Sequence, residues 1–144
     1  MSEQNFANHT KLVPTFHFFV IPVMVLNFVQ SIVRVVHSGF TWDGLVGMLT
    51  ALALVLLTFH ARIFALRVQD RVIRLEERLR MNRLLPDDLK PRIGEFTTSQ
   101  LVGLRFAGDE ELPSLARQVL NDKITDLKTI KRSVKQWRGD YLRA

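Results

Sequence analysis

The hydrophobic positions of this chain gather into two long apolar stretches in its first half. The first covers residues 13–37, and the second begins at residue 44, after a short interval at 38–43. A helix needs about 20 apolar residues to cross roughly 30 Å of hydrocarbon, and both stretches reach that length. The pattern therefore predicts an all-α membrane protein with a two-helix transmembrane hairpin, in which 38–43 forms the external loop.

A cleaved signal peptide is the main alternative for the first stretch, and a buried soluble hairpin is another. A signal peptide has a basic start, an apolar core of about 7–15 residues and a small-residue cleavage site. Lys11 is the only lysine or arginine before residue 13, and the apolar stretch is longer than such a core. An uncleaved span is therefore the favoured interpretation.

The second stretch is expected to continue as one helix into the cytoplasm. Neither proline nor glycine occurs between Met48 and Leu85. A single helix is predicted over 44–85, ended by Pro86 because proline disfavours α geometry in the residue before it. Small and apolar residues recur along this helix at alternating gaps of three and four, which is a heptad seam. The seam comprises Gly44, Gly47, Ala51, Leu54, Thr58, Ala61, Ala65, Val68, Val72, Leu75 and Leu79.

The chemistry of the seam changes at the expected membrane boundary. Its first part is rich in small residues, which let helices approach closely in lipid, and its last part is Val and Leu, whose burial from water drives association. The seam pattern does not identify the surface that packs on it. That surface belongs either to the chain's own first span and C-terminal helices or to a second molecule. The pairs Asp70–Arg74 and Glu76–Arg80 are each expected to add about 0.2–0.5 kcal/mol to helix stability.

The first span carries a polar face made of Asn27, Gln30, Ser31 and Arg34 at helical spacing. Polar side chains in hydrocarbon face protein or a water-filled cavity. Hydrogen bonding between helices is the favoured interpretation, because such bonds are common between packed membrane helices. A substrate or ion path is the alternative.

His17 and His60 are expected at similar depth near the cytoplasmic side of the hairpin. Two such imidazoles could ligate a haem or a metal ion. A ligating histidine normally donates its other ring nitrogen to a partner, and no carboxylate stands ready for either ring. The sequence therefore predicts no cofactor and no metal site.

The C-terminal region, residues 86–144, has start signals typical of short helices. Thr97 and Gln100 match a capping box. Asp109 is expected to cap the next helix, with Glu110 and Glu111 favourable at its positive end. These acids, together with Asp87 and Asp88, are interpreted as structural.

A last helix is predicted to start near Thr125 or Asp126 and to run through Tyr141. Its apolar stripe comprises Leu127, Ile130, Val134, Trp137 and Tyr141, and its basic face comprises Lys128, Lys131, Arg132, Lys135 and Arg138. A core-facing helix with a solvated basic side is favoured. Contact of the basic face with anionic lipid is the next choice. Nucleic-acid binding is not expected, since no recognised motif supports it.

Charge and composition predict the orientation in the membrane and argue against several classes of enzyme. The 144 residues have a formal net charge of +6 and include no cysteine. Basic residues cluster after the second span at Arg62, Arg67, Arg71, Arg74, Arg78, Arg80 and Arg83. By the positive-inside rule both termini are expected in the cytoplasm, with residues 1–12 as a cytoplasmic tail. No phosphate-binding loop, zinc-protease or nucleophile-elbow motif is present, so enzyme activity is not expected.

Several strings are specific enough to suggest a family. They are EQNFANH at 3–9, VQDRVIRLEERLR at 68–80, LVGLRFA at 101–107, DEEL at 109–112, IK at 130–131 and WRGDY at 137–141. Through these strings, nearly the whole chain resembles a family of short bacterial membrane proteins described only as a domain of unknown function. The resemblance implies a two-span protein with a cytoplasmic helical tail and carries no activity or cofactor.

The function expected from these observations is that of a non-enzymatic scaffold or accessory subunit of the bacterial inner membrane. Its partners would be the lipid bilayer and either further copies of itself or a larger membrane complex. A small transport or ion-conducting oligomer is one alternative. A membrane-tethered regulator, whose basic tail binds anionic lipid or nucleic acid, is the other.

Overall fold

The computed structural model describes residues 4–6, 8 and 12–141. Over these residues the chain is all-helical, with no strand, which confirms the predicted all-α class. The chain divides into two compact units. Residues 11–66 form the first, here named the hairpin unit. Residues 67–144, together with the described residues among 1–10, form the second, named the tail unit.

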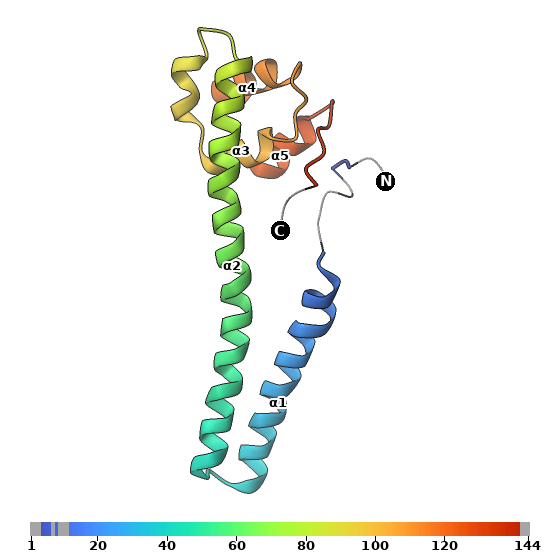
Figure 1. Ribbon diagram of the computed structural model, residues 1–144, viewed down its shortest axis with the longest axis vertical. Coiled ribbons are helices and arrows are strands. Elements are labelled where there is room, and N and C mark those ends of the chain that lie inside the picture. The colour runs from blue at the N-terminus through green and yellow to red at the C-terminus, as the bar shows by residue number, and fades with distance from the viewer. Residues whose placement is uncertain (1–3, 7, 9–11, 142–144) are drawn as a thin grey trace. The chain divides into compact units, whose positions relative to one another are not determined.

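The hairpin unit is built from two apolar helices joined by a short turn (Figure 1). A π-helical segment, η1 (Thr15–Val20), leads into α1 (Ile21–Ser38), and α2 (Trp42–Leu84) follows after three residues. The wide turns of η1 lie directly before Pro22, which lacks an N–H and crowds the carbonyl four residues back. Gly39 makes the turn at φ 78°, a left-handed conformation that glycine adopts without steric cost.

Few side chains of the hairpin unit are covered by the unit itself. Among its described residues, only Val35 and Ala51 are buried, at 2% and 3% exposure. Its two helices, Thr15–Ser38 and Trp42–Leu84, are long and apolar enough to cross a membrane by length and composition. The second helix begins two residues before the predicted start and ends one residue before the predicted end.

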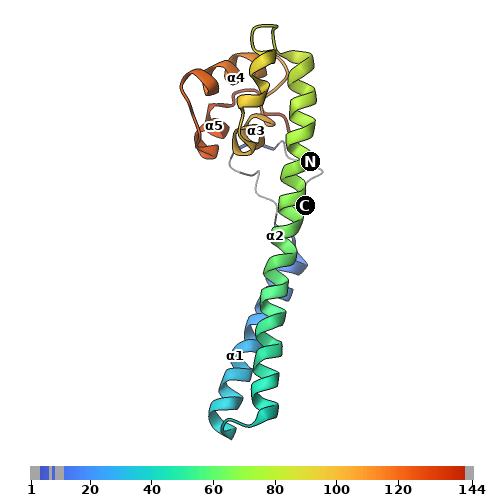
Figure 2. The same ribbon diagram turned by 90° about the vertical axis from the view of Figure 1, so that its left-hand side faces the viewer.

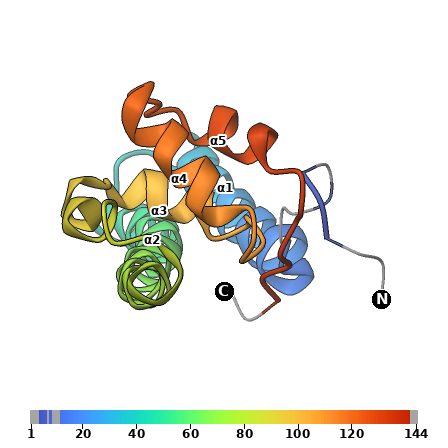
Figure 3. The ribbon, with the colours of Figure 1, turned by 90° about the horizontal axis from the view of Figure 1, so that it is seen from above.

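The tail unit packs four short elements against the C-terminal part of α2 (Figure 2). These elements are the 3₁₀-helix η2 (Lys90–Glu95), α3 (Thr98–Leu104), α4 (Leu112–Asn121) and α5 (Leu127–Ser133). Helix α3 lies between α2 and α5 (Figure 3). A Cβ added to Gly103 of α3 would come within 2.8 Å of Ile130 Cγ2 on α5, so glycine permits this close approach. The core comprises Met81, Leu85, Leu89, Ile93, Phe96, Leu101, Leu104, Ala107, Leu112, Leu115, Ala116, Val119 and Ile130.

The predicted helix caps are correct in one case and wrong in another. The Thr97 side chain accepts from the Gln100 N–H, and the Gln100 side chain accepts from the Thr97 N–H, so the capping box is confirmed. Asp109 does not cap α4, whose N-cap is Glu111 and has no side-chain cap. Asp109 binds Arg80 instead, because a charged hydrogen bond to a guanidinium is stronger than one to a neutral N–H.

The predicted last helix is too long. Asp126 caps α5 by accepting from the Thr129 N–H at 2.8 Å, but the helix ends at Ser133. Residues 134–141, here named the strap, are not helical. The strap is held by backbone hydrogen bonds to the segment between α3 and α4: the Gly108 N–H donates to the Gln136 carbonyl at 2.8 Å, and the Arg138 N–H donates to the Phe106 carbonyl at 2.7 Å.

Candidate functional site

The cytosolic half of the predicted seam is an open apolar surface of the tail unit. Its members Val68, Val72, Leu75 and Leu79 are 62%, 49%, 62% and 58% exposed. The residues of α2 that pack on the tail core lie on another face of the helix: Ile73, Glu77, Arg80 and Met81 are at most 5% exposed. With about 3.6 residues per turn, the centres of these two faces are roughly 150° apart. The chain's own C-terminal helices therefore do not cover this half of the seam.

The other half of the seam lies in the hairpin unit and differs from residue to residue. Ala51 is buried, and a Cβ added to Gly44 would meet Val35 Cγ2 at 3.2 Å, so this end packs on α1. A Cβ added to Gly47 would have no atom within 4 Å. Thr58 is half-buried and donates its hydroxyl to the Leu54 carbonyl at 2.8 Å. The remaining members, Leu54, Ala61 and Ala65, are exposed.

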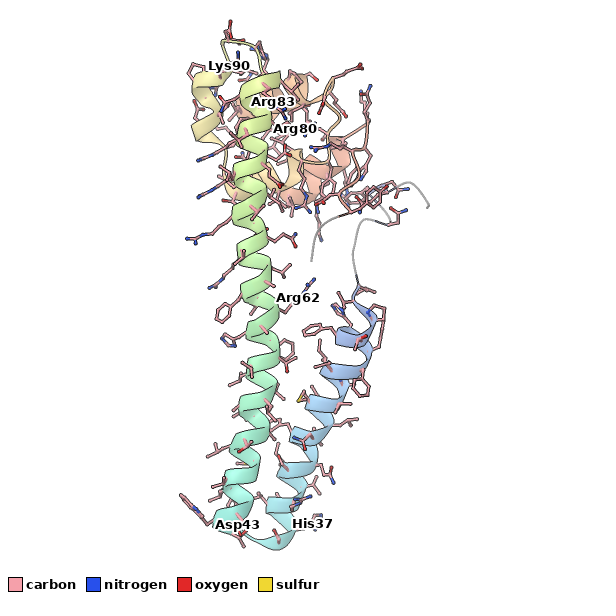
Figure 4. The ribbon with its side chains drawn as sticks, viewed as in Figure 1. His37, Asp43, Arg62, Arg80, Arg83 and Lys90 are labelled. Carbon is pink, nitrogen blue, oxygen red and sulfur yellow. The ribbon has the colours of Figure 1, made fainter. Side chains whose placement is uncertain are left out.

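The polar face of α1 and the first glycines of the seam share one recess in the hairpin unit. The recess has a volume of about 200 Å³ and is lined by Asn27, Gln30, Ser31, Arg34, Asp43, Gly44 and Gly47. Asp43 lies at the turn end of the hairpin (Figure 4). Ser31 is satisfied within α1, because its hydroxyl donates to the Phe28 carbonyl at 2.7 Å. Asn27, Gln30 and Arg34 are exposed, and their polar groups are thus available to a partner outside the unit.

His17 and His60 each contact the backbone carbonyl four residues earlier in the chain. The ring Nδ1 of His17 lies 2.9 Å from the Val13 carbonyl, and that of His60 lies 2.8 Å from the Leu56 carbonyl. Within the described ranges, no three His, Asp or Glu side chains gather as metal ligands.

Arg80 is the centre of a buried charge cluster in the tail unit. It lies near the C-terminal end of α2 (Figure 4), and its side chain is 5% exposed. Its guanidinium donates to Glu77 Oε2 at 3.1 Å, to Asp109 Oδ1 at 2.6 and 2.9 Å, and to the Ala107 carbonyl at 2.6 Å. Arg138 of the strap adds a longer contact to Glu77 Oε1 at 3.4 Å. The cluster therefore joins α2 to the α3–α4 connection and to the strap.

The surroundings in the cluster shift the pKa values of its two carboxyl groups in opposite directions. Burial raises the pKa of Glu77 above its usual value, because the loss of solvation outweighs the attraction of Arg80 and Arg138. Hydrogen bonding from Arg80 lowers the pKa of Asp109, which stays largely in solvent. Neither the Glu76–Arg80 pair nor the Asp70–Arg74 pair forms an ion pair among the described residues. Arg80 turns instead to Glu77 and Asp109, which offer several charged hydrogen bonds.

Glu111 and Asp88, which are interpreted from the sequence as structural, bind partners far away in the chain. The Glu111 carboxylate accepts from the Lys135 N–H at 2.9 Å and from the Gln136 N–H at 2.8 Å, and so fixes the start of the strap. Asp88 accepts from Arg117 at 2.7 Å, and this hydrogen bond lowers the Asp88 pKa. Such partners are 24 to 29 residues apart, so no local sequence pattern indicates them.

The end of the strap also binds the N-terminal tail. The Asp140 N–H donates to Gln4 Oε1 at 2.7 Å, and Gln4 Nε2 donates to the Asp140 carbonyl at 3.4 Å. Of the predicted tail 1–12, residues 1–3, 7 and 9–11 lie outside the described residues, and Glu3, Ala7 and His9 of the family-like string are among them. Nothing in the sequence pattern pairs Gln4 with Asp140.

The predicted basic face is not one continuous surface. Lys131 is buried, and its ammonium lies 5.1 Å from the centre of the Phe106 ring. Phe106 is also stacked on Trp137, with ring centres 4.5 Å apart, so Trp137 packs on the tail unit itself although it does not lie in a helix. Tyr141 is 59% exposed and does not continue an apolar stripe. Lys128, Arg132, Lys135 and Arg138 are exposed, but the last two belong to the strap rather than to a helix.

The described residues thus form an all-helical tail with a buried charge cluster and an exposed apolar surface on α2. The ionisable groups of the cluster bind one another, and the seam of α2 presents apolar side chains to the outside. The whole chain, residues 1–144, matches the model of a family of unknown function, DUF6526, and belongs to that family. No curated protein and no solved structure matches the chain.

Proposed function

We propose that this protein is a non-enzymatic scaffold or accessory subunit of the bacterial inner membrane, and that it self-associates through the seam of α2. The observation that carries the proposal is the exposure of Val68, Val72, Leu75 and Leu79 on a helix segment whose opposite face packs on the tail core. Large apolar side chains exposed in a row mark an interaction surface. Their heptad spacing is the pattern by which one helix pairs with another.

The hairpin supports the same proposal from the lipid side. Arg34 at the membrane centre would cost about 2.5–3.5 kcal/mol on insertion scales, and less near the interface. Exposed Asn27 and Gln30 add to that cost unless they find partners. A second copy that packs on the seam glycines would cover the recess in which these three side chains lie.

Replacing Val72 and Leu75 together by aspartate tests self-association. Both side chains are exposed in the single chain, so the fold should survive, whereas two carboxylates inside a helix interface would be buried without partners. Size-exclusion chromatography with light scattering in mild detergent should show the wild type as an oligomer and the double variant as a monomer. Arg74→Asp is the matched control, because it places the same carboxylate outside the seam. A double variant of unchanged size would refute the proposal.

Reporter fusions test the membrane location and orientation. Fusions at Ala144 should give a cytoplasmic signal, and an insertion at Ser38 should give an external one, because the arginines after the second span favour the cytoplasm. The Gln4–Asp140 contact supports termini on a common side. An external signal from the Ala144 fusion would overturn the orientation.

A small transport oligomer is the second candidate, favoured by the polar recess of the hairpin. Arg34→Gln should then change ion or solute flux into liposomes that contain the purified protein, while the oligomer stays intact. Absence of flux in the wild type would dismiss this candidate and leave the scaffold proposal standing.

A further inference from the structure

The exposed seam defines a heptad register for the cytosolic part of α2. Counting positions from a to g, Ala65, Val72 and Leu79 occupy a, and Val68 and Leu75 occupy d. The flanking positions are then Arg71 at g and Glu76 at e. Both side chains are exposed, and neither forms an ion pair among the described residues. Residues at e and g are those that choose the partner and orientation in a coiled coil.

The charges at these flanking positions match only one arrangement of two identical helices. In a parallel pair in register, a g residue faces the e residue five positions later in its partner, which brings Arg71 to Glu76. In an antiparallel pair, g faces g, and Arg71 would meet arginines. Two chains anchored in the same membrane with one orientation are also parallel. The β-branched Val72 at a with Leu75 at d is the combination that favours two strands.

The match also explains where the pairing ends. The next g and e positions are Arg78 and Arg83, which would repel each other across a parallel pair. The following d and a positions are Asn82 and Pro86, which do not continue an apolar seam. Arg78 is half-buried on its own chain, with its Nε atom buried. The complementary segment therefore runs from Ala65 to Leu79.

We infer that the partner of this surface is a second copy of the chain, paired parallel and in register through residues 65–79, with Arg71 of each copy bound to Glu76 of the other. This inference rests on the proposed self-association and deepens it. It names the occupant of the seam, the orientation and the pair of side chains that selects both.

Cysteine cross-linking of the 144-residue chain in native membranes tests the orientation. Because the sequence contains no cysteine, a disulfide can form only at the introduced position. Leu75→Cys should form a disulfide-linked dimer under mild oxidation, since d residues of a parallel pair in register face each other. Arg74→Cys, outside the seam, is the matched control and should remain monomeric. Equal cross-linking of both variants would mean random collision and would overturn the inference.

Charge exchange in the Leu75→Cys background tests the ion pair. Arg71→Glu and Glu76→Arg should each weaken dimerisation about five- to ten-fold, because two exposed pairs per dimer are lost and like charges face each other. The double exchange should restore it. An equimolar mixture of the two single variants, distinguished by size tags, should form the mixed dimer in preference to either homodimer.

The outcomes separate this inference from the proposal beneath it. If Leu75→Cys cross-links and neither the double exchange nor the mixture restores pairing, the chain self-associates but Arg71 and Glu76 do not select its register. If Leu75→Cys yields no dimer and the wild type is monomeric in detergent, self-association itself is wrong, and another protein or lipid covers the seam. Trp137 emission, measured for every variant in a Trp42→Phe background, shows whether the tail unit remains folded.

Discussion

The hairpin unit and the tail unit differ in the solvent exposure of their apolar side chains. In the tail, Phe106, Leu101 and Leu104 are completely buried in a core closed by the chain itself. In the hairpin, Phe18 and Phe19 are 69% and 63% exposed, and only two described side chains are buried. A row of exposed phenylalanines in water would be an aggregation hazard. The comparison shows that the tail closes its own apolar core, whereas most apolar side chains of the hairpin are left uncovered by the single chain.

The largest expected effect comes from removing one aromatic ring from each unit. Phe106→Ala should lower the free energy of unfolding of the tail by about 3–5 kcal/mol, because the ring is buried and stacked on Trp137. Phe19→Ala should change hairpin stability by no more than about 0.5 kcal/mol. Denaturant unfolding of the full chain in detergent measures both, with Trp137 as the tail reporter in a Trp42→Phe background and Trp42 as the hairpin reporter in a Trp137→Phe background. Equal losses would erase the contrast between the units.

Glycine substitutions offer a smaller test of the same contrast. Gly103→Ala should destabilise the tail by about 1–3 kcal/mol, because the new methyl group would press on Ile130. Gly47→Ala meets no atom within 4 Å, and alanine favours a helix interior over glycine by about 0.5–1 kcal/mol. It should therefore be neutral or stabilising when the Val72→Asp/Leu75→Asp changes keep the chain monomeric. Thermal unfolding of the two variants should give shifts of opposite sign, and a destabilising Gly47→Ala would place a neighbour where the hairpin has none.

The buried carboxyl group gives the tail a dependence on pH. Because the Glu77 pKa is raised in the folded tail above 4.5, the folded state binds that proton more tightly than the unfolded state does. Wild-type stability should thus fall relative to Glu77→Gln as pH rises from about 4.5 through the raised pKa, with a slope of at most about 1.4 kcal/mol per pH unit. Asp109, whose pKa is lowered, loses its contribution only as pH falls below its usual range, outside this window. Urea unfolding at several pH values measures the difference in unfolding free energy between the wild type and Glu77→Gln. A difference that does not change with pH would contradict burial of the Glu77 carboxyl group.

The smallest effect is expected at the contact between the two ends of the tail unit. Gln4→Ala removes two partly exposed hydrogen bonds to the Asp140 backbone and should cost less than about 1 kcal/mol. Its clearest sign would be faster amide hydrogen exchange at Asp140, measured by mass spectrometry of the C-terminal peptide. Gln118→Ala, on the exposed side of α4, is the control and should leave that amide unchanged. Unaltered exchange in Gln4→Ala would show that the strap needs no help from the N-terminal tail.

Local patterns in the sequence predict local structure well in this chain. Apolar length, proline position and the Thr97–Gln100 box indicate both long helices, the end of α2 and the start of α3. The prediction of α5 fails because Val134, Trp137 and Tyr141 keep a helical spacing while the strap takes its hydrogen bonds from Gly108 and Glu111. Residue spacing alone does not distinguish a continued helix from a non-helical strap.

The candidate surface could be predicted in its members but not in its exposure. The heptad spacing indicates Val72 and Leu75 as a packing face, yet Ile73 and Glu77, which form the covered face, look unremarkable in the sequence. Arg80 illustrates how far local spacing can predict an ion pair. Glu76 lies four residues before Arg80, as an ion pair within a helix requires, but Arg80 binds Asp109, which lies 29 residues away. Which of several nearby acids a buried arginine selects depends on the tertiary fold.

The Gln4–Asp140 contact also has a consequence for biosynthesis. The two residues are 136 positions apart, and both apolar helices lie between them in the chain. At about 5–20 residues per second, Gln4 is added to the nascent chain roughly 7–27 s before Asp140. The Gln4 side chain cannot form this pair until the nascent chain has turned back at Gly39 and Asp140 has left the ribosome. Closure of this contact therefore has to follow the synthesis of both apolar helices, and it is a late step in the folding of the tail unit.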